Sequence, residues 1–119
     1  MRPAGPLLAA LLLVPAGCSS SVDRQRATTC RRAVPALAPP EGAVTILRVA
    51  QGPGADSVRV DYGLGQRDGR QRWLVCRFGT GAVLDAISTE QGPVSGAALY
   101  LLRHYYLDTS EAVAADPQP

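Results

Sequence analysis

The first periodic pattern of apolar residues in the chain has the period of a helix. Between Asp23 and Val34 apolar side chains recur every three or four positions, and arginines occupy the positions between them. This spacing predicts an amphipathic helix over residues 23–34 that places Cys30 on its inner face. Pro35 is expected to end or kink that helix, because proline lacks the backbone N–H that the helix needs.

The middle of the chain changes to a period of two, which is typical of half-buried strands. Four strands separated by Gly-rich turns are predicted, over residues 44–50, 57–64, 72–78 and 82–90. In the third strand Leu74, Cys76 and Phe78 share one face, and Trp73, Val75 and Arg77 share the other. In the fourth strand Val83, Ile87 and Leu84 are the candidates for burial. Sequential strands with short turns predict an antiparallel meander.

A second helical pattern follows the strands. Gln91–Pro93 is predicted to end the sheet, Ser95 to cap the helix, and residues 96–107 to form it. Ala98, Leu101, Leu102 and Tyr105 are expected to share its inner side. The predicted fold is α+β: an N-terminal helix, a four-stranded antiparallel meander and a C-terminal helix packed on one sheet face. It forms a single domain over residues 23–108, followed by a disordered tail over residues 109–119.

The start of the chain has the parts of an export signal. Residues 1–17 combine Arg2, a short apolar run and small residues before Cys18, and the run is shorter than the roughly 20 residues that span a membrane. Residues 14–18 resemble a bacterial lipobox, although Pro15 stands where that pattern has an aliphatic residue. The resemblance implies that residues 1–17 are removed and that Cys18 carries lipid, with residues 18–22 as a tether. The alternative is an ordinary signal peptide followed by a cysteine.

The remaining cysteines suggest a disulfide. If Cys18 is lipidated, only Cys30 and Cys76 are left, and an exported chain with two cysteines most simply pairs them. Two free buried thiols are the alternative. A zinc site would need four ligands, and the two cysteines with the single histidine, His104, fall short of that number. No metal and no cofactor is therefore predicted.

The distribution of charge argues against nucleic acid as a partner. All 12 basic residues are arginines, and they are interspersed with 10 acidic residues, so no clustered basic face for nucleic acid is expected. One local group, Arg24, Arg26, Arg31 and Arg32, is interpreted either as a solvated helix face near anionic lipid headgroups or as a partner site.

Candidate catalytic groups are few. His104 lies near the end of the second helix, where it is expected to complement the helix dipole, and Asp85 and Glu90 are expected to be solvated charges at strand ends. The chain is therefore predicted not to be an enzyme. Trp73 falls on the strand face opposite Cys76, and a single helix stripe cannot bury Tyr100, Tyr105 and Tyr106 together. These four aromatic residues are therefore a candidate interaction surface. The alternative is that the second helix or the tail covers them.

Several short blocks also carry a resemblance. Residues 73–78, 89–95 and 99–107, with Cys30 and Arg31 upstream, are similar to a group of short exported proteins of alphaproteobacteria, many from rhizobial relatives, that have no established function. The similarity covers most of residues 28–107 and implies the same order of helix, meander and helix. It implies no site residues.

Together these observations predict a small lipid-anchored protein of the cell envelope that faces the periplasm. The absence of aspartate directly after Cys18 is typical of lipoproteins that move on to an outer membrane. The predicted role is non-catalytic, either structural or in binding an envelope protein. The alternative is a periplasmic domain that binds a small ligand or modulates an enzyme, with the open sheet face as its site.

Overall fold

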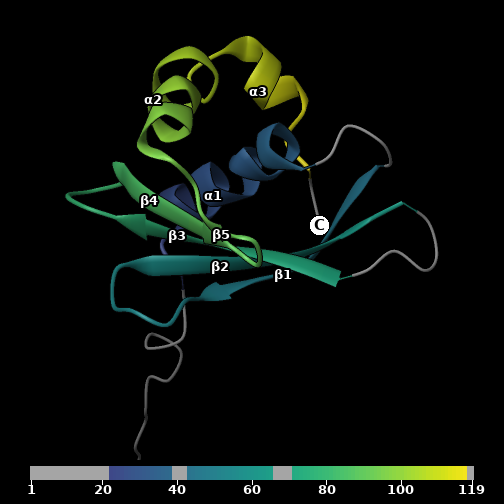
Figure 1. Ribbon diagram of the computed structural model, residues 1–119, viewed down its shortest axis with the longest axis horizontal. Helices are drawn as coiled ribbons and strands as arrows, with labels where there is room; N and C mark the ends of the chain where they lie inside the picture. The colour runs from purple at the N-terminus through teal and green to yellow at the C-terminus, as the bar shows by residue number, and fades with distance from the viewer. Residues whose placement is uncertain (1–21, 39–42, 66–70, 118–119) are drawn as a thin grey trace, which may run out of the picture.

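The computed structural model describes residues 22–38, 43–65 and 71–117 (Figure 1). The predicted α+β class is confirmed. The elements follow in the order α1 (Arg24–Leu37), β1 (Val44–Gln51), β2 (Ser57–Leu64), β3 (Gln71–Phe78), β4 (Leu84–Thr89), β5 (Gly92–Pro93), α2 (Gly96–Tyr105) and α3 (Ser110–Ala114). The strands form one antiparallel sheet in sequence order, which is the predicted meander.

In the described part of the chain the sheet has five strands, not the predicted four, because residues 92–93 pair with β4 instead of ending the sheet. The Thr89 hydroxyl explains the difference. It accepts a hydrogen bond from the Gln91 N–H (3.0 Å) and donates one to the Gly92 carbonyl (3.1 Å). Gly92 has a φ of 116°, which glycine adopts readily because it has no Cβ. This tight turn returns the chain alongside β4.

Helix α1 begins where the sequence predicts and extends further than expected. The Asp23 side chain caps it by accepting a hydrogen bond from the Arg26 N–H (3.0 Å). Pro35 lies inside the helix, which continues to Leu37. A proline in the last turn removes one intrahelical hydrogen bond, and the Ala38 N–H still bonds to the Val34 carbonyl (2.8 Å). The prediction that the helix ends at Val34 is therefore wrong by about one turn.

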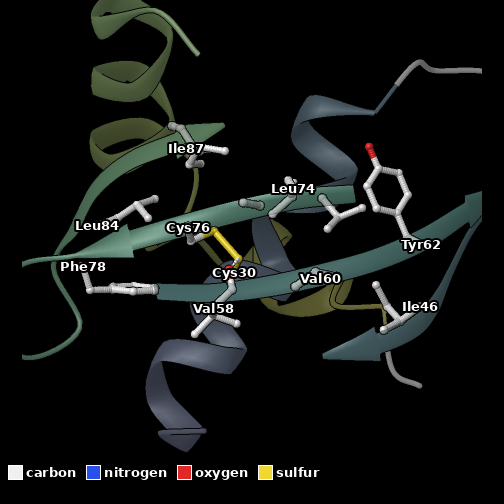
Figure 2. Packing of buried hydrophobic residues seen from close by; sticks show 13 residues of the cluster. Cys30, Ile46, Val58, Val60, Tyr62, Leu74, Cys76, Phe78, Leu84 and Ile87 are labelled. Atoms are coloured by element: carbon white, nitrogen blue, oxygen red, sulfur yellow. Dashed lines mark hydrogen bonds between the residues drawn. A yellow bond between two sulfur atoms is a disulfide. The ribbon is translucent and has the colours of Figure 1, made fainter. Parts of the chain in front are cut away.

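The core lies between α1 and one face of the sheet (Figure 2). Cys30 and Val34 of α1 are fully buried, as are Val60, Leu74 and Cys76 of the sheet. Cys30 and Cys76 form a disulfide with a Cα–Cα distance of 5.9 Å, which confirms the predicted pairing. The bridge holds Cys76 against α1. Leu74 and Phe78 lie on the same face of β3 as Cys76, so that face meets the helix.

Tyr62 extends the core toward the end of β2. Its side chain is buried together with Ile46 of β1, its register partner. Burial raises the pKa of the Tyr62 hydroxyl, and the negative charge of Glu90 adds to the shift. The phenol therefore belongs to the apolar core and stays protonated well above neutral pH.

A β-bulge corrects the predicted face of β4. Phe78 pairs with Leu84 and Arg77 pairs with Ala86, so Asp85 is an extra residue in the ladder. Leu84 and Ile87 therefore both point into the core, although they are three positions apart. Val83 lies before the strand and is 48% exposed. The prediction that Val83 is buried is wrong, and the strand starts at residue 84 instead of 82.

Helix α2 does not lie on the sheet face. Figure 1 shows α1 next to the sheet and α2 and α3 further out on the same side, and α2 contacts the sheet at β4. Ser95 caps α2 as predicted, accepting a hydrogen bond from the Ala98 N–H (3.1 Å). Leu102 is buried, but Leu101 and Tyr105 are exposed, which corrects the predicted inner side. The disulfide-linked α1 already occupies the sheet face. Helix α2 therefore packs at the edge of the sheet near β4, with the side that carries Leu102 turned inward.

Residues 109–117 are ordered in the structure, in contrast to the predicted tail. Thr109 caps α3 by accepting a hydrogen bond from the Ala112 N–H (3.1 Å), and Ala112 is 1% exposed. Beyond α3, Asp116 binds two arginines of α1. The segment looks like a tail in sequence because its anchors are a small residue and a single acid, which carry no periodic pattern. Residues 118–119 lie outside the described part.

Candidate functional site

The proposed lipid attachment site, Cys18, and the whole of residues 1–21 lie outside the described part of the chain. Within residues 22–38, 43–65 and 71–117, no helix is long and apolar enough to cross a membrane. The same residues contain no group of three or more His, Cys, Asp and Glu side chains that could hold a metal ion.

The arginine group of α1 has mostly structural contacts. Arg26 donates hydrogen bonds to the carbonyls of Gly79 (3.1 Å) and Gly81 (2.6 Å), and it forms an ion pair with Asp56 (3.1 Å). Its guanidinium also lies over the Phe78 ring, 5.4 Å from the centroid. Arg26 thus holds the β3–β4 turn against the start of α1.

Arg31 and Arg32 join α1 to the C-terminal segment. Arg31 donates to both carboxylate oxygens of Asp116 (2.7 and 2.8 Å), and Arg32 donates to one of them (3.0 Å). The hydrogen bond from Arg31 lowers the pKa of Asp116, burial opposes the shift, and the hydrogen bond from Arg32 lowers the pKa further. The same pairing raises the pKa of Arg31. Of the four arginines that form a group in sequence, only Arg24 is exposed.

Trp73 lies on the sheet face that points away from the helices. It alternates with Leu74, which faces α1. The Arg59 guanidinium covers its ring at 5.0 Å from the centroid and also pairs with Asp61 (3.0 Å). A cation over a tryptophan face is a favourable arrangement, and here it leaves the indole only partly accessible.

Tyr100 and Tyr105 lie on α2 and are brought together with Leu101 and His104 into one surface, which we call the α2 patch. The exposed fractions are 54% for Tyr100, 56% for Leu101 and 67% for Tyr105. The Tyr100 ring lies 4.3 Å from that of His104 and 6.3 Å from that of Tyr105, measured between centroids. This helix therefore has an apolar and aromatic stripe that faces solvent in addition to the stripe that it buries.

The predicted aromatic surface is only partly assembled. Tyr106 is half-buried and packs against the core, and Trp73 lies on the opposite side of the sheet from α2. Asp85 and Glu90 lie toward opposite ends of β4, and Glu90 pairs with Arg72 at 3.4 Å. The structure therefore keeps the two tyrosines of the α2 patch together and separates the other candidates from them.

A cleft with a volume of about 450 Å³ lies between α1, the start of β4 and the end of α2. We call it the α1–α2 cleft. Its lining residues come from these three segments: Gln25, Thr28, Thr29 and Arg32; Ala82, Val83 and Leu84; Arg103, His104, Leu107 and Asp108.

Hydrophobic periodicity does not reveal this cleft, although part of its signal is present in the chain. Gln25, Thr28, Thr29 and Arg32 follow helical spacing and form a polar stripe beside the buried one. No pattern in the sequence shows that the last turn of α2 faces this stripe. That arrangement depends on the packing of α2 at the β4 edge.

Comparison of the chain with protein-family models, curated proteins and solved structures found no match. The resemblance to short exported proteins of alphaproteobacteria therefore stays a prediction.

Proposed function

We propose that this protein is a small lipid-anchored, non-catalytic protein of the cell envelope that binds a partner protein through the α2 patch. One observation carries the proposal: Tyr100, Leu101 and Tyr105, each more than half exposed, lie together on one helix face. Soluble domains rarely expose contiguous apolar surface without a use, and tyrosine is enriched among residues that dominate binding energy. Placement on a regular helix also lowers the entropic cost of presenting these side chains.

Export is supported by the disulfide as well as by the leader. The Cys30–Cys76 bridge is typical of oxidising compartments, and disulfides are rare in proteins that remain in the cytosol. Lipid attachment at Cys18 places the domain close to the membrane, because only four residues separate this cysteine from the Asp23 cap of α1. The outer membrane is the proposed location.

The alternative role, binding of a small ligand or modulation of an enzyme, is favoured by a separate observation. The α1–α2 cleft is concave and contains polar side chains from two helices. It lies among the helices, whereas the open sheet face that the sequence suggests as the ligand site carries the Arg59–Trp73 stack.

The anchor is tested by fractionation of the natural host. Wild-type protein is expected in the membrane fraction, and Cys18→Ala is expected to be released from it, because that change removes the thiol that accepts lipid. Ser19→Ala, a change beside the cysteine that keeps the thiol, is the control and is expected to stay membrane-bound. Unchanged partitioning of Cys18→Ala would refute lipidation.

The α2 patch is tested by photo-crosslinking in intact cells. A photoreactive amino acid replaces Tyr105 or, as a control, the exposed Arg77 of β3. A discrete protein adduct is expected from position 105 and not from position 77. The adduct is expected to disappear when Leu101→Ser is added, since this change removes apolar contact area and not the photoreactive group. Equal adducts from both positions, or an adduct that survives Leu101→Ser, would contradict the proposed surface.

A further inference from the structure

The α1 wall of the α1–α2 cleft is a stripe of hydrogen-bonding side chains. Gln25, Thr28 and Arg32 lie at successive turns of the helix, and Thr29 lies beside Thr28, so all of them project to one side. This side is distinct from the buried side that carries Cys30. Thr28, Thr29 and Arg32 are half-buried. The stripe therefore faces the cleft and is not simply a solvated helix surface.

The opposite wall contributes the guanidinium of Arg103. Arg103 lies next to the buried Leu102 and is half-buried itself. Among the residues that the structure describes, its side chain forms no ion pair and no hydrogen bond. A guanidinium carries five N–H donors, and carboxylate and phosphate groups satisfy them best. Partial burial makes an unpaired guanidinium more costly, so a bound anion would stabilise it.

Donors outnumber anionic acceptors in the lining. Arg32 uses Nε for Asp116, and its other N–H groups have no bond within the described part of the chain. His104 and Gln25 add further donors, whereas Asp108 is the one carboxylate among the described residues that line the cleft, and it is exposed. This imbalance favours a ligand that accepts hydrogen bonds and carries negative charge.

One side of the cleft is apolar. Val83 is 48% exposed, and Ala82, Leu84 and Leu107 line the cleft with it. The cleft volume of about 450 Å³ lies within the roughly 300–1,000 Å³ range of small-molecule sites. We propose that the α1–α2 cleft binds a small organic oxyanion, in which a phosphate or carboxylate group meets Arg103 and Arg32 and an attached apolar group contacts Val83.

This inference deepens the small-ligand alternative and does not depend on the partner role of the α2 patch. The oxyanion has two sources, a soluble metabolite or the headgroup of an anionic lipid. The second is within reach because Gln25 follows Cys18 by only seven positions. Both sources offer the same chemistry to Arg103, so the experiment needs one arm for each.

The full-length protein is purified in neutral detergent micelles and followed by the NMR shifts of its backbone amides. One arm adds phenyl phosphate or benzoate, and the other adds phosphatidylglycerol to the micelles. Saturable shifts are expected at Thr28, His104 and Leu107. Arg103→Gln is expected to weaken binding about tenfold or more, because it removes a charge-assisted hydrogen bond. Arg24→Gln, which removes the same charge from an exposed site outside the cleft, is expected to leave binding unchanged.

A second variant separates binding from folding. Thr28→Val keeps the shape of the side chain and is expected to weaken binding about fivefold, since it removes one neutral hydrogen bond. Leu101→Ser, in the α2 patch, is expected to leave anion binding unchanged, so this result and that of the crosslinking test are independent. Saturation in either arm supports the proposal and identifies the source. The proposal is overturned if neither arm saturates, or if Arg24→Gln weakens binding as much as Arg103→Gln does.

Discussion

The Asp116 carboxylate connects the end of the chain to α1, and its removal gives the sharpest stability prediction. Its side chain is only 6% exposed, and its two partners Arg31 and Arg32 are 15% and 27% exposed. Asp116→Asn keeps the size of the side chain but removes the negative charge and one of the two strong acceptors. Two neighbouring arginines are then left with no carboxylate between them.

The expected loss in the free energy of unfolding follows from the burial of Asp116 and from its position near the end of the chain. Breaking a buried ion pair costs roughly 3–5 kcal/mol, but here the arginines regain contact with water, and the C-terminal segment can detach without global unfolding. We therefore expect a loss of about 2 kcal/mol in the free energy of unfolding, or roughly 10 °C in Tm for a domain of this size. Asp56→Asn is the matched control, because Asp56 pairs with Arg26 but is 63% exposed, and its loss is expected to be about 0.5 kcal/mol or less.

The pH dependence provides an independent check with a defined sign. The folded-state pKa of Asp116 is lowered, so its contribution to stability is fully present above the unfolded-state pKa of about 3.9. That contribution is lost as the pH falls through the lower, folded-state pKa. The gap between wild type and Asp116→Asn is therefore constant near neutral pH and closes in acid.

Urea denaturation, followed by the fluorescence of the single tryptophan, Trp73, measures the free energies. Amide hydrogen exchange in α3 measures local detachment, and Asp116→Asn is expected to accelerate exchange there more than in β3. A stability loss from Asp116→Asn no larger than that from Asp56→Asn would contradict the stabilising role of the Asp116 ion pairs. So would a gap to wild type that persists unchanged at strongly acid pH.

Two other changes test the core and a helix cap. The double substitution Cys30→Ala with Cys76→Ala is expected to cost about 4 kcal/mol, since the bridge closes a loop of 46 positions in the unfolded chain. A urea midpoint that does not move would contradict this, and reduced wild-type protein is the companion measurement. Ser95→Ala is expected to cost about 1 kcal/mol by leaving the Ala98 N–H without its acceptor. Circular dichroism at rising temperature measures that loss, and the neighbouring exposed Ala97→Ser is a control that leaves the cap intact.

Sequence patterns were sufficient for the elements that have a regular period. The alternation in residues 57–64 and 72–78 predicts both strands and the face that each one buries. The helical spacing around Cys30, together with the cysteine count, predicts the disulfide. These predictions succeed because one face of each element is apolar, and burial of that face dominates the stability of a small domain.

Sequence patterns failed where the chain departs from a regular period. The bulge at Asp85 shifts the alternation, so Val83 becomes exposed and Leu84 buried. The turn at Thr89 adds β5 through two side-chain hydrogen bonds that no hydrophobic pattern announces. The predicted inner side of α2 includes Leu101 and Tyr105, but the side that packs on the core carries Leu102 and Tyr106. The prediction is off by one position because this helix is apolar on both sides.

By itself, the sequence determined the α+β class, the antiparallel meander, the disulfide partners and the cap of α2, since each depends on local pattern or on a small set of residues. Only the tertiary structure decided which surfaces exist. The α2 patch lies on the side of α2 that the fold leaves unburied. The pairing of Asp116 with α1 and the α1–α2 cleft both combine side chains from segments that are distant in the sequence. Their positions follow from the disulfide-linked α1 occupying the sheet face, which leaves α2 to pack at the β4 edge.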